Sequence, residues 1–190
     1  MTDRVVVSDR VAQEDWLKRY YFTRAGFSTL WVIAVLAIGQ RSPAASAFLL
    51  VSYSAWDAFS NFIDGRRNGG LAKNRTQLLN VVVSLAVAVA LATALPDMNR
   101  VLAVFGAWAI VSGLLQLGTA MRRWKVSGAQ WAMALSGAQS ALAGAFFLFQ
   151  AQLPAAPSIV SLVGYAGFGA FYFLVSALLL SATARRRRSA

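Results

Sequence analysis

A run of 59 residues without a charged side chain, from Val126 to Ala184, constrains this chain more than any other feature of its sequence. A single helix over this run would be about 90 Å long at 1.5 Å per residue, roughly three times the thickness of the hydrocarbon core of a bilayer. The run must therefore fold back on itself. The break is predicted at residues 150–157, which contain two glutamines and two prolines. The sequence thus predicts two antiparallel apolar helices joined by a short turn.

The composition of the whole chain agrees with this interpretation. Hydrophobic residues make up 58% of the 190 residues and charged residues only 13%, whereas soluble domains are about 45–50% apolar and about 25% charged. So many apolar side chains do not fit into one small soluble core, so lipid is the expected solvent. Because Cys and His do not occur, disulfides, thiolate and imidazole chemistry, and the usual ligands of zinc and haem are excluded. We expect no metal and no cofactor.

Apolar segments of about 20 residues, long enough to cross a bilayer, recur six times. The expected spans are Tyr20–Gly39, Ala45–Ile63, Gln77–Leu95, Arg100–Met121, Gly128–Gln150 and Ser158–Ala184. Short proline-containing turns join the members of each pair. We therefore expect an all-α fold, a polytopic membrane bundle of six transmembrane helices arranged as three antiparallel hairpins.

The charged ends of the chain are expected to lie outside this membrane domain, which covers residues 20–184. Residues 1–19 form a polar N-terminal tail, the first 15 of them loose, and residues 185–190 form a basic C-terminal tail.

Two segments admit another interpretation. Residues 43–63, which contain Asp57 and Asn61, could form a re-entrant or interfacial segment instead of the second span. The basic N-terminus, the first apolar segment and residues 45–47 (ASA) also resemble a secretory signal with its cleavage site. Cleavage would remove the first span and break the alternation of charge between the loops. We therefore keep both segments as spans.

The basic residues predict the orientation of the helices, because short loops rich in Lys and Arg stay in the cytoplasm. Of the 18 Lys and Arg residues, 15 lie in the two tails or in the loops after spans two and four, and only Arg41 and Arg100 lie on the opposite side. Both termini are therefore expected in the cytoplasm. The net charge of +11 would otherwise suggest nucleic-acid binding, which we do not expect. Topology also accounts for the tail arginines, which could in addition attract anionic lipid: Arg185, Arg186, Arg187 and Arg188.

Short repeats relate the predicted hairpins to one another. Residues 53–60 (YSAWDAFS) align with residues 105–112 (FGAWAIVS) at an offset of 52. Residues 102–117 (LAVFGAWAIVSGLLQL), then Arg122-Arg123, then Trp131 with Gly137 and Gly144 resemble the HdeD-like acid-resistance membrane protein family. The resemblance covers about residues 20–184 and is best from Asn80 onward.

The resemblance implies six helices in three hairpins, a place in the bacterial inner membrane, a link to acid or stress tolerance, and no catalytic residues. The second span departs from the family pattern. There Trp56-Asp57 and Asn61 stand where the family has apolar residues and glycine. The resemblance therefore does not extend to a mechanism that involves these residues.

Asp57 is the most informative side chain, because a charge within a span is costly and usually faces a partner inside the bundle. Helix geometry puts Asp57 ~9 Å and Arg24 ~6 Å from the cytoplasmic ends of their spans, so we predict that they pair. Asn61, one helical turn from Asp57, and Asn80 in the third span would complete an intramembrane polar cluster. Arg75 is a competing partner for Asp57.

Three interpretations of this cluster stay open. It is a proton-responsive or substrate-contacting site, or a buried ion pair that fixes the register of the helices, or Arg24 extends to the membrane interface instead. Acid sensing would require Asp57 to take up a proton readily, which a close arginine opposes.

Small side chains recur every four residues on two spans. Ser136, Ser140 and Gly144 lie on span five, and Asn80 and Ser84 begin a similar series on span three. This spacing predicts close packing between helices.

Neither a phosphate loop nor a pair of acids within the spans occurs, so we expect no enzyme. The first hypothesis is a non-enzymatic multi-pass inner-membrane protein linked to stress or acid tolerance. The alternative is a small transporter or channel with the Arg24–Asp57 cluster on its path. The polar residues lie in the cytoplasmic half and the outer half is apolar, which argues against an open pore. The sequence leaves the oligomeric state open.

Overall fold

The computed structural model describes the backbone of residues 2–125 and 130–189, and all regular secondary structure in these residues is helical. The order is α1 (Thr2–Ala34), the π-helical turn η1 (Val35–Gly39), α2 (Pro43–Arg67), α3 (Arg75–Ala94), α4 (Met98–Arg123), α5 (Gln130–Gln150), the 3₁₀ turn η2 (Ile159–Leu162) and α6 (Val163–Ser189). The all-α prediction is confirmed. Gly128, where the fifth span was predicted to begin, lies outside the described residues.

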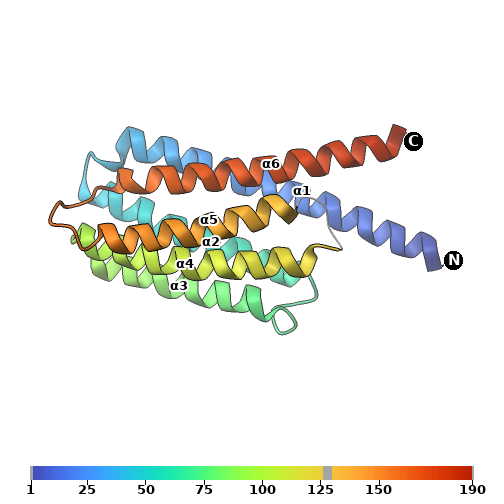
Figure 1. The fold of residues 1–190 in the computed structure, drawn as a ribbon, viewed down its shortest axis with the longest axis horizontal. Helices are drawn as coiled ribbons and strands as arrows, with labels where there is room; N and C mark the ends of the chain where they lie inside the picture. The colour runs from blue at the N-terminus through green and yellow to red at the C-terminus, as the bar shows by residue number, and fades with distance from the viewer. Residues whose placement is uncertain (1, 126–129, 190) are drawn as a thin grey trace.

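The helices lie alongside one another in an elongated bundle (Figure 1). Both termini lie at one end, together with the α2–α3 loop, the end of α4 and the start of α5. We call this the basic end, because it carries Arg66, Arg67, Arg122, Arg123 and Arg185. The turn 40–42, which Pro43 follows, and the proline-containing turns 95–97 and 151–158 lie at the opposite end, which we call the proline end.

Consecutive helices run in opposite directions, but the most extensive packing is not within the predicted hairpins. It joins α4 to α5, α1 to α6, and α2 to α3. The backbones of α1 and α2 lie farther apart, and side chains such as Phe27 and Trp56, whose rings stack, join these two helices. The contacts form a closed ring, in which each helix meets its neighbours in the sequence and α1 meets α6.

Glycines explain why α4 and α5 are the closest pair. A Cβ atom on Gly113 would lie 2.5 Å from the carbonyl oxygen of Gly137, and one on Gly137 would lie 2.7 Å from that of Gly113. Gly106 and Gly144 approach in the same reciprocal way. The two backbones touch because neither side has a side chain, which is a common way for membrane helices to pack. The packing role predicted for Gly144 agrees with this contact.

The turns contain the residues that local geometry requires. Ser42 caps α2 by accepting a hydrogen bond from the Ala45 amide, and Pro43 occupies its first turn. Asp97 caps α4 through the amides of Asn99 and Arg100. In the α2–α3 loop, Gly69 and Gly70 have φ of 92° and 93°, a backbone region that favours glycine.

The first helix is longer than predicted. α1 begins at Thr2, so the expectation that residues 1–15 form a loose tail is wrong. Leu17 and Tyr21 are buried in a cluster with Ala177 and Leu180 of α6. Figure 1 shows α1 and α6 side by side in the bundle and diverging toward their termini.

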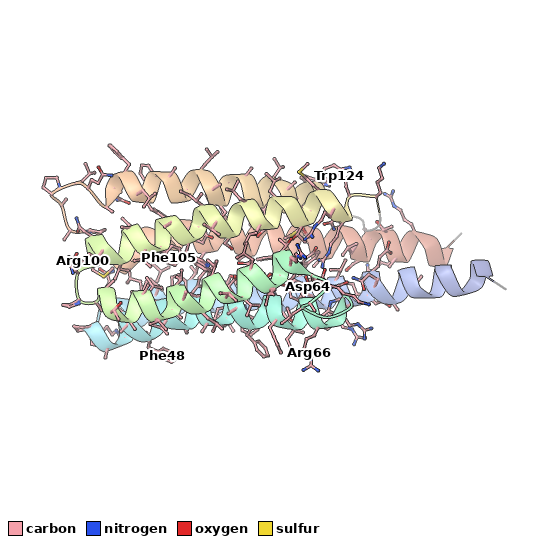
Figure 2. All side chains as sticks on the ribbon, turned by 90° about the horizontal axis from the view of Figure 1, so that it is seen from below. Phe48, Asp64, Arg66, Arg100, Phe105 and Trp124 are labelled. Carbon is pink, nitrogen blue, oxygen red and sulfur yellow. The ribbon has the colours of Figure 1, made fainter. Side chains whose placement is uncertain are left out.

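Five helical segments within the described residues are long and apolar enough to cross a membrane: Val11–Gly39, Arg75–Ala94, Met98–Arg123, Gln130–Gln150 and Ile159–Arg186. Large apolar side chains point outward from the bundle, among them Leu30 and Leu142 of these segments and Phe48 of α2 (Pro43–Arg67), each about 70% exposed. Figure 2 shows Phe48 pointing away from the bundle. Such surfaces suit lipid and not water, and together they indicate a multi-pass membrane protein.

Helix α2 lacks the composition of these five but is continuous over 25 residues, about 37 Å. Its polar residues are buried against other helices, among them Ser54, Asp57, Ser60 and Asn61. Because these polar side chains face other helices, they lower the mean hydropathy of α2 without reaching the outer surface, where Phe48 and Phe59 are exposed. The structure does not have the re-entrant break considered for this segment.

Aromatic residues form the core of the half toward the proline end. Phe105 lies inside the bundle in this half (Figure 2), and its ring contacts those of Tyr53, Trp108, Phe147 and Tyr165. Tyr53 and Phe105, which align in the internal repeat, therefore meet in the core, with ring centroids 6.1 Å apart.

Candidate intramembrane site

Arg24 of α1 and Asp57 of α2 form an ion pair inside the bundle. Arg24 Nη2 donates to Asp57 Oδ1, and the two side chains are 15% and 7% exposed. The pair predicted from the sequence is therefore present. Arg75, the competing partner, lies at the start of α3 with its side chain exposed. Arg24 points inward to Asp57, which excludes the interpretation that it extends to the membrane interface.

Two further donors hold the other oxygen of the Asp57 carboxylate. Asn61 Nδ2 donates to Asp57 Oδ2 at 3.1 Å, and Ser84 Oγ donates to it at 2.9 Å. Ser84 Oγ in turn accepts a hydrogen bond from Trp108 Nε1 at 3.0 Å. Asp57 thus joins α1, α2 and α3, and Ser84 extends the network to α4. A carboxylate held by three donors from three helices is suited to fixing those helices in register.

Asn80 belongs to this network only at its edge. Its side chain is buried, and Ser84 Oγ lies 3.5 Å from Asn80 Oδ1. The direct contact with Asp57 is made by Ser84, which the four-residue spacing on this helix had assigned to packing. The signal available in the sequence was that the Ser84 hydroxyl lies one helical turn from Asn80, which was predicted to belong to the polar cluster.

The guanidinium group of Arg24 has two other neighbours. Nη1 donates to Tyr20 Oη at 3.1 Å, and the guanidinium carbon lies 4.4 Å from the ring centroid of Phe173. The ring face offers the cation an additional attraction in a site with little water. Because a guanidinium has five N–H donors, Arg24 retains donors beyond those used by Tyr20 and Asp57.

A second buried ion pair lies closer to the basic end. Arg123 Nη2 donates to Asp64 Oδ2 at 2.8 Å, and Gln77 Nε2 and Asn68 Nδ2 also donate to the Asp64 carboxylate. Figure 2 shows Asp64 directed into the bundle and Arg66 directed away from it. Asp64 follows the predicted second span directly, and the sequence analysis assigned it no role. The usable signal was the opposite charge of Asp64 and Arg123 at helix ends that lie at the same end of the bundle.

A cavity of about 340 Å³ opens beside the Arg24–Asp57 pair. Eight of its 19 lining residues are aromatic, so we call it the aromatic cavity. Most of its wall comes from α5 and α6, and the exposed rings of Phe146 and Phe168 lie at its rim. The cavity therefore reaches the lipid-facing surface between these two helices.

The residues predicted to pack helix α5 have mixed roles. Ser136 is buried and lines the aromatic cavity, as does Ser140. Ser140 Oγ also donates to the carbonyl oxygen of Ala109 at 2.9 Å and lies 2.9 Å from Tyr165 Oη. Of the three predicted residues, Gly144 serves close packing alone.

A smaller cavity, about 40 Å³ in volume, lies between the two ion pairs. Its wall contains polar residues from five helices, among them Asn61, Thr76, Gln77 and Asn80, so we call it the polar cavity. Both cavities share the side chains of Arg24, Asp57, Gln116 and Phe173.

The C-terminal arginines lie at the basic end, beyond both cavities. The side chains of Arg185 and Arg186 are exposed, and those of Arg187 and Arg188 lie outside the described residues. Comparison of the chain with models of protein families, with characterised proteins and with solved structures finds no match.

Proposed function

We propose that this chain is a non-enzymatic multi-pass membrane protein that binds a small organic molecule in the aromatic cavity and carries it across the bilayer. The observation that supports this function is the position of the Arg24–Asp57 pair in the wall of a 340 Å³ cavity. Ligand sites in proteins range from about 300 to 1,000 Å³ and combine apolar walls with a few placed polar groups. Ionisable residues within a membrane bundle are functional candidates by default.

The chemistry of the cavity suggests the class of molecule. Aromatic rings such as Tyr53, Phe147 and Tyr165 suit an apolar body, and Arg24 has donors left for a carboxylate or carbonyl oxygen. The charges of Arg24 and Asp57 cancel, which favours a neutral or zwitterionic ligand over one with a net charge. A zwitterion could replace the internal contact, its anionic group on Arg24 and its cationic group on Asp57.

A carrier fits the bundle better than an open channel does. The half toward the proline end is filled by buried apolar residues, including Leu50, Leu91, Leu102, Phe105 and Leu162. A pore would need a polar or wide lining across the whole membrane. The ligand would therefore cross by a rearrangement of helices.

The proposed topology has both termini in the cytoplasm of a bacterial cell and α2 as a sixth span. The clustering of basic residues at one end supports it, because such loops are retained on the cytoplasmic side. The continuous 25-residue α2 alongside the other helices supports the sixth span.

The second candidate function is a role in acid or stress tolerance, as the resemblance to the HdeD-like family implies. The reciprocal contacts of Gly106 with Gly144 and of Gly113 with Gly137 support the resemblance, because they give its glycine spacing a structural purpose. The two candidates are compatible if the carried molecule is one met under stress.

Uptake by proteoliposomes tests the carrier. Radiolabelled tryptophan and phenylalanine serve as zwitterionic probes, with glutamate and lysine as charged comparisons. We expect uptake of the zwitterions above empty vesicles, its loss in Asp57→Asn, and its retention in Asp97→Asn, which alters a half-exposed carboxylate at the proline end. Uptake at the level of empty vesicles for all four compounds would contradict the carrier function.

Survival after acid shock tests the second candidate. A strain lacking the gene is compared with its parent and with the strain carrying either the unchanged gene or the Asp57→Asn version. Lower survival of the deletion strain, restored by the unchanged gene, is expected; equal survival of deletion and parent would count against a role in acid tolerance.

A further inference from the structure

The polar cavity contains a buried oxygen atom without a hydrogen-bond partner. Gln77 is 3% exposed, and its Nε2 donates to Asp64 while Oε1 meets no donor among the described residues. A buried carbonyl oxygen left without a donor costs about 1–3 kcal/mol. Gln77 lines the 40 Å³ cavity, so the missing donor has a place to sit.

The size and chemistry of the polar cavity suit water. A cavity needs roughly 10–15 Å³ for one molecule and two to four polar partners for it. A volume of about 40 Å³ therefore holds about two or three waters. Asn61, Thr76 and Asn80 offer further donors and acceptors around them.

The polar cavity extends inward from the basic end. Thr76 lies in the first turn of α3 and Arg123 in the last turn of α4, and both contribute to its wall. Asp57 precedes Asp64 by seven residues on α2, which places the first ion pair about 10 Å deeper than the second. The cavity thus connects a pair near the aqueous phase with a pair inside the bundle.

We propose that the polar cavity is a water site reached from the basic end, and that the Arg24–Asp57 pair is the gate between it and the aromatic cavity. The pair, with Gln116 and Phe173, forms the wall common to both cavities. Separation of Arg24 from Asp57 would join the two spaces and open the aromatic cavity to the aqueous phase at the basic end. The gate rests on the proposed carrier function, whereas the water site does not.

The chain has no cysteine of its own, so single introduced cysteines can report access to each cavity. Asn80→Cys reports the polar cavity and Ala143→Cys the aromatic cavity. Ser54→Cys is the control, because Ser54 is fully buried on α2 and lines neither cavity. Silver ion is added at the basic-end side of sealed vesicles, and the remaining thiols are alkylated after denaturation and counted by mass spectrometry.

We expect Asn80→Cys to react with silver at least tenfold faster than Ser54→Cys. Equal rates would overturn the water site, whatever the outcome of the uptake experiment. Ala143→Cys is expected to react as slowly as Ser54→Cys in the otherwise unchanged chain, and at least tenfold faster when combined with Asp57→Asn.

A second variant keeps the gate testable if Asp57→Asn does not fold. Phe173→Ala shortens the common wall without altering either charge, and it should raise the reactivity of Ala143→Cys in the same direction. Fast reaction of Ala143→Cys without either substitution, or no rise with a folded variant, would overturn the gate. If the zwitterions are not taken up but Asn80→Cys and Ala143→Cys react as expected, the gate stands and admits a different ligand. The failure of the proposed carrier function is then distinguished from a failure of the gate.

Discussion

Asp64 at the end of α2 and Arg123 at the end of α4 form a buried ion pair, with Arg123 Nη2 and Asp64 Oδ2 2.8 Å apart. The contact joins two helices that are not neighbours in the ring of contacts. Gln77 of α3 donates to the same oxygen, so three helices meet at one carboxylate.

Removal of one partner of this pair is expected to destabilise the bundle. Arg123→Met leaves the buried Asp64 charge without its cation, which costs about 3–5 kcal/mol, whereas the double variant with Asp64→Asn should recover much of the loss. The free energy of unfolding in detergent measures the loss in the single variant and the recovery in the double variant. The control is Arg100→Met, whose ion pair with Asp97 is 76% and 47% exposed and should contribute less than about 1 kcal/mol. Equal losses for Arg123→Met and Arg100→Met would show that the Asp64 contact is unimportant.

The reciprocal glycine contact predicts a steric effect. Gly113→Ala places a Cβ atom 2.5 Å from the Gly137 carbonyl oxygen, and the overpacking should cost about 1–3 kcal/mol as α4 and α5 separate. Gly118→Ala is the matched control on the same helix, because nothing lies within 4 Å of its Cβ position. It should stay within about 1 kcal/mol of the parent. Thermal unfolding in detergent distinguishes them, and unchanged stability of Gly113→Ala would refute the contact.

The hydroxyl of Ser84 links Trp108 to Asp57, and its removal should break a hydrogen bond at each of them and destabilise the bundle. Ser84→Ala leaves the buried indole N–H of Trp108 without an acceptor and Asp57 with one donor fewer, at a cost of about 1–3 kcal/mol. Ser52→Ala is the control, because Ser52 Oγ donates only within its own helix. The double variant Ser84→Ala/Trp108→Phe should lose less than the sum of the single variants. Strict additivity would mean that the two residues are not coupled.

Labelling of two loops decides whether α2 crosses the membrane. Gln40→Cys lies before α2 at the proline end and Ala72→Cys lies after it at the basic end, both at exposed positions. In intact cells, a membrane-impermeant maleimide should label Gln40→Cys, and should label Ala72→Cys only after permeabilisation. Labelling of both from the same side would rule out α2 as a span and reduce the number of crossings to five.

The Arg24–Asp57 pair was predictable because each charge lies within an apolar segment, where an unpaired charge is too costly. The Asp64–Arg123 pair was not predictable, because charges at helix ends usually meet water, and only the packing of α3 against both α2 and α4 encloses them. Ser84 was misjudged for a related reason. A serine suits close packing and hydrogen bonding equally well, and its role depends on which residues lie against it in the fold.

The helix boundaries followed from charge-free segments, prolines and glycines, but the choice of neighbours did not. Short turns predicted that consecutive helices pair, and they do run antiparallel. Yet α4 and α5 pack most closely, because glycines at positions 106, 113, 137 and 144 let the backbones touch. The polar residues of the N-terminal segment did not indicate that α1 begins at Thr2, and the local sequence did not reveal that Leu17 and Tyr21 pack on the distant α6.

The contact between the first and last helices has a consequence for biosynthesis. The rings of Tyr21 and Phe173 lie in tilted contact with centroids 6.1 Å apart, yet about 150 residues of the chain are synthesised between them. The inward face of α1 must therefore wait in the membrane, covered by lipid or by an assisting protein, until the final helix has left the ribosome. A chain that stops after α5 would never bury Leu17 and Tyr21, which gives the cell a simple means of telling unfinished copies from complete ones.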